Sequence, residues 1–190
     1  NLSYSIPQGH GKQRHDHPIL QNISASAAPG QMVAIMGPSG SGKTSLLNLL
    51  AGRVSTHHHI TGTVTANGQL RPADWRRVVG YVEQDDVLYR TLTVGETIEF
   101  AAKMRLPKRA SGEGEGDVRV EKAAEVMHAL GLEHVKDSKI GDNLHRGVSG
   151  GERKRTSIAV ELVADSKVLF LDEPTSGLDA FTAFYIIEMI

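Results

Sequence analysis

The stretch that decides the fold is QMVAIMGPSGSGKTSLLNLLAG, residues 31–52. Its first seven residues are mainly apolar and end in glycine, which predicts a buried strand over residues 31–37. Residues 42–52 carry leucines at helical spacing and end in glycine, which predicts a helix that stops at Gly52. A strand that passes through a glycine-rich loop directly into a helix is typical of layered α/β proteins.

The loop itself, GPSGSGKT at residues 37–44, matches the pattern G-x-x-x-x-G-K-[ST]. Glycines allow the backbone to curl so that several N–H groups point at one phosphate chain, and the helix adds its positive dipole end. Lys43 would reach the β- and γ-phosphates, and the Thr44 hydroxyl would bind Mg²⁺. A glycine-rich turn without a ligand is the alternative, but the strand–helix context favours nucleotide binding. We expect the phosphates to contact Gly37, Pro38, Ser39, Gly40, Ser41, Gly42, Lys43, Thr44 and Ser45.

A second apolar strand, KVLFLDEP at residues 167–174, ends in two carboxylates. Asp172 is placed to hold the Mg²⁺ shell, and Glu173 is the natural general base for an attacking water. The alternative is a pair of surface acids in a turn before Pro174. The phosphate loop upstream favours the catalytic interpretation.

The remaining segments alternate between short strands and longer helices. We expect a hairpin over residues 62–68, a strand over 77–84, helices over 93–107, 118–132 and about 150–164, and a mobile loop over 108–117. The pattern predicts an α/β layered fold with a largely parallel core sheet. Because the stretch from 93 to about 165 lacks a good strand, it predicts a separate helical subdomain.

The composition excludes several classes of protein. The 190 residues include 21 basic and 22 acidic side chains, so broad nucleic-acid binding has no electrostatic basis. The absence of cysteine excludes a disulfide framework and fits a reducing compartment. The sequence contains no run of 18 apolar residues, so we expect no membrane-spanning helix within these residues. Trp75 is expected to be a packing anchor, whereas His10, His15, His17 and the triplet at 57–59 are expected to be polar loop residues without a metal.

The stretch GVSGGERKRTS, residues 147–157, combines a helix start with strong positive charge. Ser149 and Glu152 have capping-box spacing, which predicts a helix that begins at Gly150. A helix start with exposed amides and a serine hydroxyl is also an anion site. The three cations that follow, residues 153–155, are expected to form mainly a solvated face.

The motifs GPSGSGKT, VEQDD, VSGGERKR and LFLDEPTSGLD follow one another in this order. Together they resemble the nucleotide-binding domain of ABC transporters, and GERKRTSIAVEL and DEPTSGLDA are similar to the G subfamily of half-transporters. The resemblance implies a P-loop ATPase core over residues 1–92 and 166–190, with an N-terminal antiparallel β portion. It implies that the helical subdomain, about 93–165, carries the signature motif.

The family's residue roles follow from the matching motifs. Gln84 matches the glutamine that contacts Mg²⁺ or the attacking water, so the implied metal ligands are Thr44, Gln84 and Asp172. The signature residues Ser149, Gly150, Gly151 and Glu152 would face the nucleotide of a partner domain, and Asp179 belongs to the loop that spans the dimer interface. Tyr4 matches the aromatic that stacks on adenine, although a packing role is the alternative. No histidine follows Asp179, so we expect the switch histidine beyond Ile190 and weak hydrolysis by this chain alone.

The resemblance also implies partners and a location. An exporter motor would use ATP and Mg²⁺, pair head to tail with a second ABC ATPase domain, and attach on the cytoplasmic side to a transmembrane domain outside these residues. A soluble ABC-type ATPase that acts on ribosomes or nucleic acid is the main alternative, and a small-molecule P-loop kinase is a second one. No heptad run lies between Lys43 and Ser149, which disfavours the chromosome and repair types.

Overall fold

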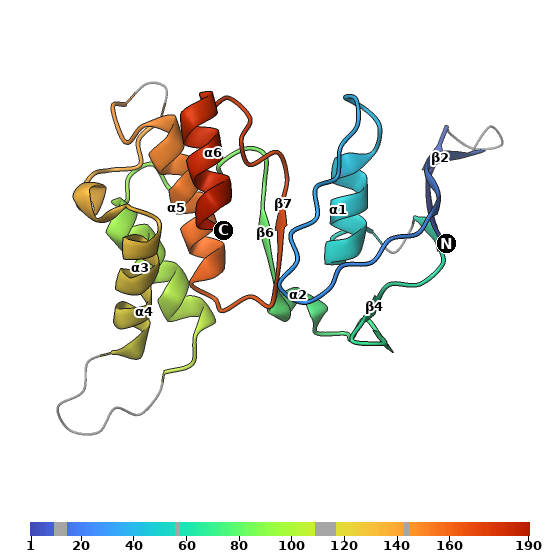
Figure 1. The fold of residues 1–190 in the computed structure, drawn as a ribbon, viewed down its shortest axis with the longest axis horizontal. Helices are drawn as coiled ribbons and strands as arrows, with labels where there is room; N and C mark the ends of the chain where they lie inside the picture. Colours follow the sequence, from blue (N-terminus) through green and yellow to red (C-terminus); the bar gives the residue numbers. More distant parts are fainter. Residues whose placement is uncertain (10–14, 56–57, 109–116, 143–144) are drawn as a thin grey trace. The chain divides into compact units, whose positions relative to one another are not determined.

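The computed structural model describes residues 1–9, 15–55, 58–108, 117–142 and 145–190. These residues form two compact units, residues 1–76 and 77–190 (Figure 1). Each unit combines helices with paired strands and has a hydrophobic core of its own. The mixed α/β composition that the sequence predicted is confirmed.

A three-stranded antiparallel sheet opens the first unit. Strand β1 (Leu2–Gln8) pairs with β2 (His15–Ile23) on one side and with β3 (His59–Thr61) on the other. The hydrophobic core of this unit contains Leu2, Tyr4, Leu20 and Leu49. This sheet corresponds to the antiparallel β portion expected near the N-terminus.

His15 and His17 lie in strand β2 and not in the loop that the sequence predicted. His15 pairs with Gln8 and His17 with Ile6, because backbone pairing continues along both arms of the hairpin. His10 lies outside the described residues.

Helix α1 (Lys43–Ala51) confirms the predicted helix and its predicted end. Gly42 and Gly52 flank it with φ angles of 89° and 75°, in the left-handed region that favours glycine. The indole Nε1 of Trp75 donates to the carbonyl of Leu50 at 2.9 Å, so Trp75 caps the last turn of α1. This contact is in line with the structural role expected for Trp75.

The hairpin predicted from the Asn-Gly pair is also present. Strands β4 (Thr65–Ala66) and β5 (Gln69–Leu70) pair antiparallel across Asn67 and Gly68. Both turn residues have positive φ, 51° and 77°, as a type I′ turn requires.

Residues 31–37 do not form the strand that the sequence predicted. Met32, Val33 and Met36 are 57%, 50% and 90% exposed. An apolar run becomes a strand only where a neighbouring strand supplies hydrogen-bond partners. In the first unit as described, the strands pair with one another and none pairs with this segment.

The second unit is built around two parallel strands. Strand β6 (Val79–Val82) pairs with β7 (Val168–Leu171), with Val79 opposite Val168 and Val82 opposite Leu171. A short helix, α2 (Trp75–Val78), precedes β6, so the strand begins two residues later than predicted. The parallel pairing brings the carboxyl ends of both strands to one edge.

The longer helices of the second unit gather on one side of the β6–β7 pair (Figure 1). They are α3 (Val94–Arg105), α4 (Val118–Ala129), α5 (Gly150–Leu162) and α6 (Ala180–Met189), and the 3₁₀ turn η2 (Glu133–Val135) follows α4 in the chain. Fully buried Ile98, Leu130 and Ile158 belong to their common core. Most of the predicted mobile loop, residues 109–116, lies outside the described residues. Among the helices described, none is long and apolar enough to cross a bilayer.

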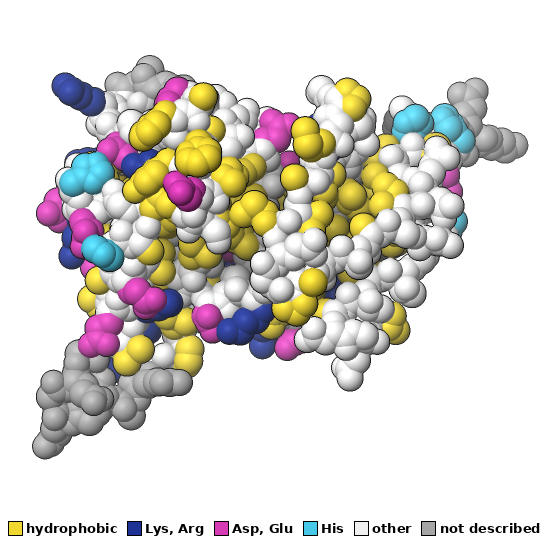
Figure 2. Space-filling model, viewed as in Figure 1, with side chains coloured by type: hydrophobic (Ala, Val, Ile, Leu, Met, Phe, Trp, Pro, Cys, Tyr) yellow, Lys and Arg dark blue, Asp and Glu magenta, His cyan; other side chains and the backbone are white. Residues whose placement is uncertain are grey.

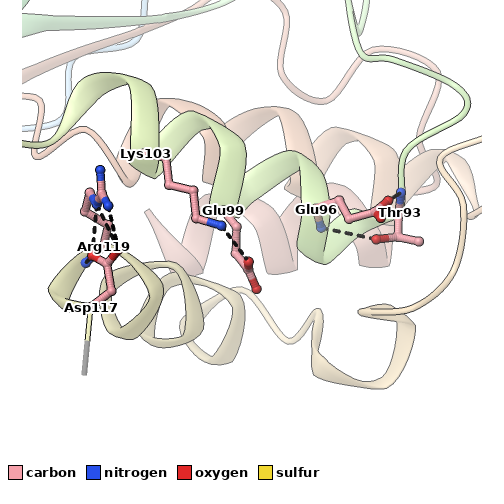
Figure 3. Close-up of polar contacts among 6 residues, drawn as sticks. All are labelled: Thr93, Glu96, Glu99, Lys103, Asp117 and Arg119. Atoms are coloured by element: carbon pink, nitrogen blue, oxygen red, sulfur yellow. Dashed lines mark hydrogen bonds and ion pairs between the residues drawn. The ribbon is translucent and has the colours of Figure 1, made fainter. Parts of the chain in front are cut away.

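Side-chain caps define where α3 and α4 begin (Figure 3). Thr93 N–H donates to Glu96 Oε2 at 2.8 Å and Glu96 N–H donates to Thr93 Oγ1 at 3.1 Å, which is the predicted capping box. Asp117 caps α4 and also binds Arg119, whose guanidinium lowers the pKa of Asp117 to about 2.

We predict that Thr93→Ala lowers the free energy of unfolding by about 1 kcal/mol, because the first turn of α3 loses its side-chain acceptor. Urea unfolding followed by circular dichroism measures the change. Thr93→Ser is the control and should retain most of the stability. Equal stability of the alanine variant and the wild type would contradict the capping role.

Candidate functional site

The glycine-rich loop before α1 is curled. Gly40 and Gly42 have φ angles of 78° and 89°, which turn the backbone back on itself. Lys43 Nζ donates to the carbonyls of Gly37 and Pro38, each at 3.0 Å. The lysine therefore bends back over the start of its own loop, as expected for a cation that meets a phosphate chain held there.

The other residues predicted at this loop lie beside the lysine. Thr44 and Ser45 follow it in the first turn of α1, so a hydroxyl and several amides lie at the positive end of the helix. A side chain at position 42 would meet Leu20 at 3.0 Å, so packing against β2 requires the glycine as well. The local geometry agrees with the phosphate-binding prediction.

Tyr4 is 6% exposed and belongs to the core of the first unit. Its hydroxyl lies 2.6 Å from His58 Nδ1, and the two rings are 5.5 Å apart. Burial raises the pKa of the phenol. In this structure Tyr4 therefore has the packing role that the sequence left as the alternative, and its stacking on adenine stays a prediction.

The carboxyl edge of the β6–β7 pair brings three predicted site residues together. Gln84 Nε2 donates to Glu173 Oε2 at 3.0 Å. Asp172, 4% exposed, donates its N–H to the carbonyl of Val82 at 2.9 Å, which extends the parallel ladder by one residue. Sequence motifs 89 residues apart thus meet because two strands share one register.

Glu173 has an unusual backbone conformation. Its φ is 46°, whereas the other non-glycine residues described with positive φ are Asn22, Asn67 and Asp165, types that tolerate this region. For glutamate the conformation costs roughly 1–3 kcal/mol. Its carbonyl accepts a hydrogen bond from Ser176 N–H at 3.0 Å in the turn that follows. Such strain is characteristic of functional positions, and the exposed carboxylate is accessible to water.

The oxygen atoms of Thr44, Gln84 and Asp172 suit Mg²⁺, a hard cation that prefers such ligands. Because Gln84 uses its Nε2 for Glu173, its Oε1 is the atom that could bind a metal. In the parts of the chain that the structure describes, no group of three or more His, Asp or Glu side chains is arranged so that it could hold a metal ion by itself. The oxygen chemistry of each of these side chains agrees with its predicted role as an Mg²⁺ ligand, which stays a prediction.

The start of α5 has the predicted capping box. Ser149 N–H donates to Glu152 Oε2 at 2.7 Å, and Glu152 N–H donates to Ser149 Oγ at 3.3 Å. Partial burial opposes ionisation of Glu152, but hydrogen bonds from Ser149 and from His134 Nε2, 3.1 Å away, outweigh it and lower its pKa. The carboxylate is therefore held ionised at the positive end of the helix.

Gly151 and Asp179 have local structural roles in addition to those predicted. A side chain at position 151 would approach Thr182 Cγ2 to 2.7 Å, so glycine allows α5 to pack closely on α6. Asp179 caps α6: its Oδ1 accepts from the N–H groups of Phe181 and Thr182, and its Oδ2 from the Thr182 hydroxyl at 2.7 Å. Sequence reasoning did not find this packing, because it joins two separate motifs.

The cations after the glycines do not all form a solvated face. Lys154 is 3% exposed, and its Nζ donates to the carbonyl of Gln84 at 2.9 Å and pairs with Asp86 Oδ1 at 2.8 Å. The expectation was wrong for Lys154 because the helix turns this position inward, toward the segment after β6. A cavity of about 250 Å³ beside it is lined by Gln84, Asp85, Asp86, Gly150, Arg153, Lys154, Ser176, Gly177 and Leu178.

We predict that Gly151→Ala destabilises the chain by about 1–3 kcal/mol, because the added methyl overpacks the contact with Thr182. Thermal or urea unfolding measures the loss. Thr182→Ser removes the clashing methyl and keeps the hydroxyl bound to Asp179, so the double variant should recover most of the stability. A double variant no more stable than Gly151→Ala would show that the contact is not the cause.

We compared this chain with protein-family profiles, with curated proteins and with solved structures. A profile of the family described as ABC transporter matches residues 20–176. The broad substrate specificity ATP-binding cassette transporter ABCG2 of Bos taurus and ABC transporter G family member 22 of Arabidopsis thaliana are each 49% identical over 90% of this chain. The chain spans about a quarter of their length, 25% and 22%. Among solved structures, this chain is similar to a dimeric, post-hydrolysis state of the ATP-binding cassette MJ0796 bound to ADP and Pi, with a TM-score of 0.70 and 25% sequence identity. The similarity covers 100% of this chain and 81% of the MJ0796 chain.

Proposed function

This chain belongs to the ABC transporter family, and from that premise we propose that it binds ATP with Mg²⁺ and hydrolyses it as the motor domain of a membrane exporter. The observation that carries the proposal is the contact of Gln84 with Glu173 at the carboxyl edge of β6 and β7. The curled G-x-x-x-x-G-K-T loop of the first unit separately supports phosphate binding.

The residues of the first unit bind the nucleotide phosphates in this proposal. Backbone N–H groups between Gly37 and Ser45 donate to phosphate oxygens, and Lys43 exchanges its two loop carbonyls for the β- and γ-phosphates. Thr44, Gln84 and Asp172 hold Mg²⁺, which neutralises charge on the phosphate oxygens when bound. Tyr4 would have to leave the core to stack on adenine, so we assign adenine contact to it only as a prediction.

Glu173 acts as the general base. Gln84 holds one of its carboxylate oxygens, which fixes the direction of the other. Glu173 accepts a proton from water while the water oxygen bonds to the γ-phosphorus and the bond from that phosphorus to the oxygen of ADP breaks. The left-handed backbone at Glu173 supports this role, since it turns the residue sharply out of the strand direction.

A second ABC ATPase domain completes the proposed site. The start of α5, with Ser149, Gly150, Gly151 and Glu152, offers N–H groups and a positive dipole end to the terminal phosphate of the partner's nucleotide. Asp179, which caps α6, lies in the loop proposed to span the interface. The dimeric state of the similar solved cassette supports this assignment.

We further propose that residues 1–92 and 166–190 form the ATPase core and about 93–165 the helical subdomain, on the cytoplasmic side of a transmembrane domain outside these residues. The names of the relatives, which are transporters, support an exporter over a soluble ABC-type ATPase acting on ribosomes or nucleic acid. The near-neutral charge agrees, because it gives nucleic acid no broad basic surface to bind.

We predict that Glu173→Gln in the full-length protein lowers ATP turnover about 10²–10⁴-fold while ATP binding persists, because the amide cannot accept the proton. Phosphate release and retention of labelled nucleotide measure the two properties. Glu125→Gln, an exposed acid of α4, is the matched control and should turn over ATP like the wild type. Wild-type turnover by Glu173→Gln would refute its role as base.

A further inference from the structure

Lys154 is a buried cation in the second turn of α5. Its side chain is 4% exposed, and that of its partner Asp86 is 14% exposed. The ammonium lies 2.8 Å from Asp86 Oδ1, 2.9 Å from the carbonyl of Gln84 and 3.4 Å from that of Glu83. The ammonium thus donates to two carbonyls and forms an ion pair with Asp86, and all three partners belong to one short segment after β6.

A buried charge is costly unless its partners satisfy it, and a buried ion pair often adds little net stability. An apolar side chain of similar length could fill the same volume. What an apolar side chain cannot do is hold two carbonyls in fixed positions. The contacts of Lys154 therefore specify the path of residues 83–86 more than they strengthen the fold.

The held segment includes the residue that contacts Glu173. The carbonyl of Gln84 binds Lys154, and its side-chain Nε2 binds Glu173 at 3.0 Å. The backbone and the side chain of one residue are therefore both anchored. Without Lys154, the Gln84 carbonyl loses this partner and the Gln84 backbone is free to move. Its side-chain amide is then no longer held in position on Glu173.

We propose that Lys154 is a positioning residue for hydrolysis: by holding the Gln84 carbonyl, it places the Gln84 amide on Glu173. This inference rests on the proposed function, since it needs Glu173 to act in the reaction. Lys154 lies on the same rigid helix as Ser149 and Gly150, so it links the helix start that would face a partner's nucleotide to the base of its own chain. A shift of α5 would therefore move the helix start and the ammonium that holds Gln84 together.

The first test is Lys154→Met in the full-length protein with Mg²⁺ and ATP. We expect kcat to fall about 10–100-fold, because a misplacement of about 1 Å can cost that much, while KM for ATP changes less than about 3-fold. Lys103→Met, which removes an exposed lysine paired with Glu99 (Figure 3), should leave kcat unchanged. Unchanged kcat in Lys154→Met would overturn the inference.

The second test is a double-mutant cycle with Gln84→Ala. If Lys154 acts through Gln84, adding Lys154→Met to Gln84→Ala causes little further loss of kcat. A purely structural role predicts that the two losses multiply, and that outcome would overturn the inference.

Asp86→Asn keeps the test decisive if Lys154→Met does not fold. It weakens the hold on Lys154 without adding volume, and it should lower kcat about 3–10-fold with KM nearly constant. A wild-type kcat in this variant would count against the inference. Wild-type full-length protein without ATP turnover would instead refute the proposed function itself.

Discussion

The parallel pairing of β6 and β7 is the interaction on which the candidate site depends. Its register places Val82 opposite Leu171, so the next residues of both strands emerge at one edge. Asp172 continues the ladder through Val82, and Glu173 meets the Gln84 amide. A slip of one residue would turn Asp172 to the opposite face of the sheet and separate the pair.

The first turns of α5 and α6 also determine where predicted site residues lie. Ser149 and Asp179 cap α5 and α6, and Gly151 allows these two helices to pack closely near those caps. The same residue types therefore serve the fold and the predicted ligand contacts. Apolar side chains of α6, among them Phe181, Phe184 and Tyr185, are exposed. Hydrophobic side chains gather on this face of the second unit (Figure 2).

Features encoded by neighbouring residues could be predicted from the sequence. The boundaries of α1 follow from Gly42 and Gly52, and the starts of α3 and α5 follow from capping boxes. Features that depend on distant partners could not be predicted: the burial of Lys154 needs the segment after β6, and the strand expected at 31–37 lacks a pairing neighbour in the described residues. Tyr4 shows the same limit, because a motif match does not report that a ring is packed into a core.

The most direct test is an experimental structure of the full-length protein with Mg²⁺ and a non-hydrolysable ATP analogue. If the carboxyl edge of β6 and β7 is the catalytic edge, the terminal phosphate lies within hydrogen-bond reach of the Gln84 side chain, with Glu173 beside the position of the attacking water. A bound nucleotide whose terminal phosphate lies away from both residues of the same chain would contradict the assignment.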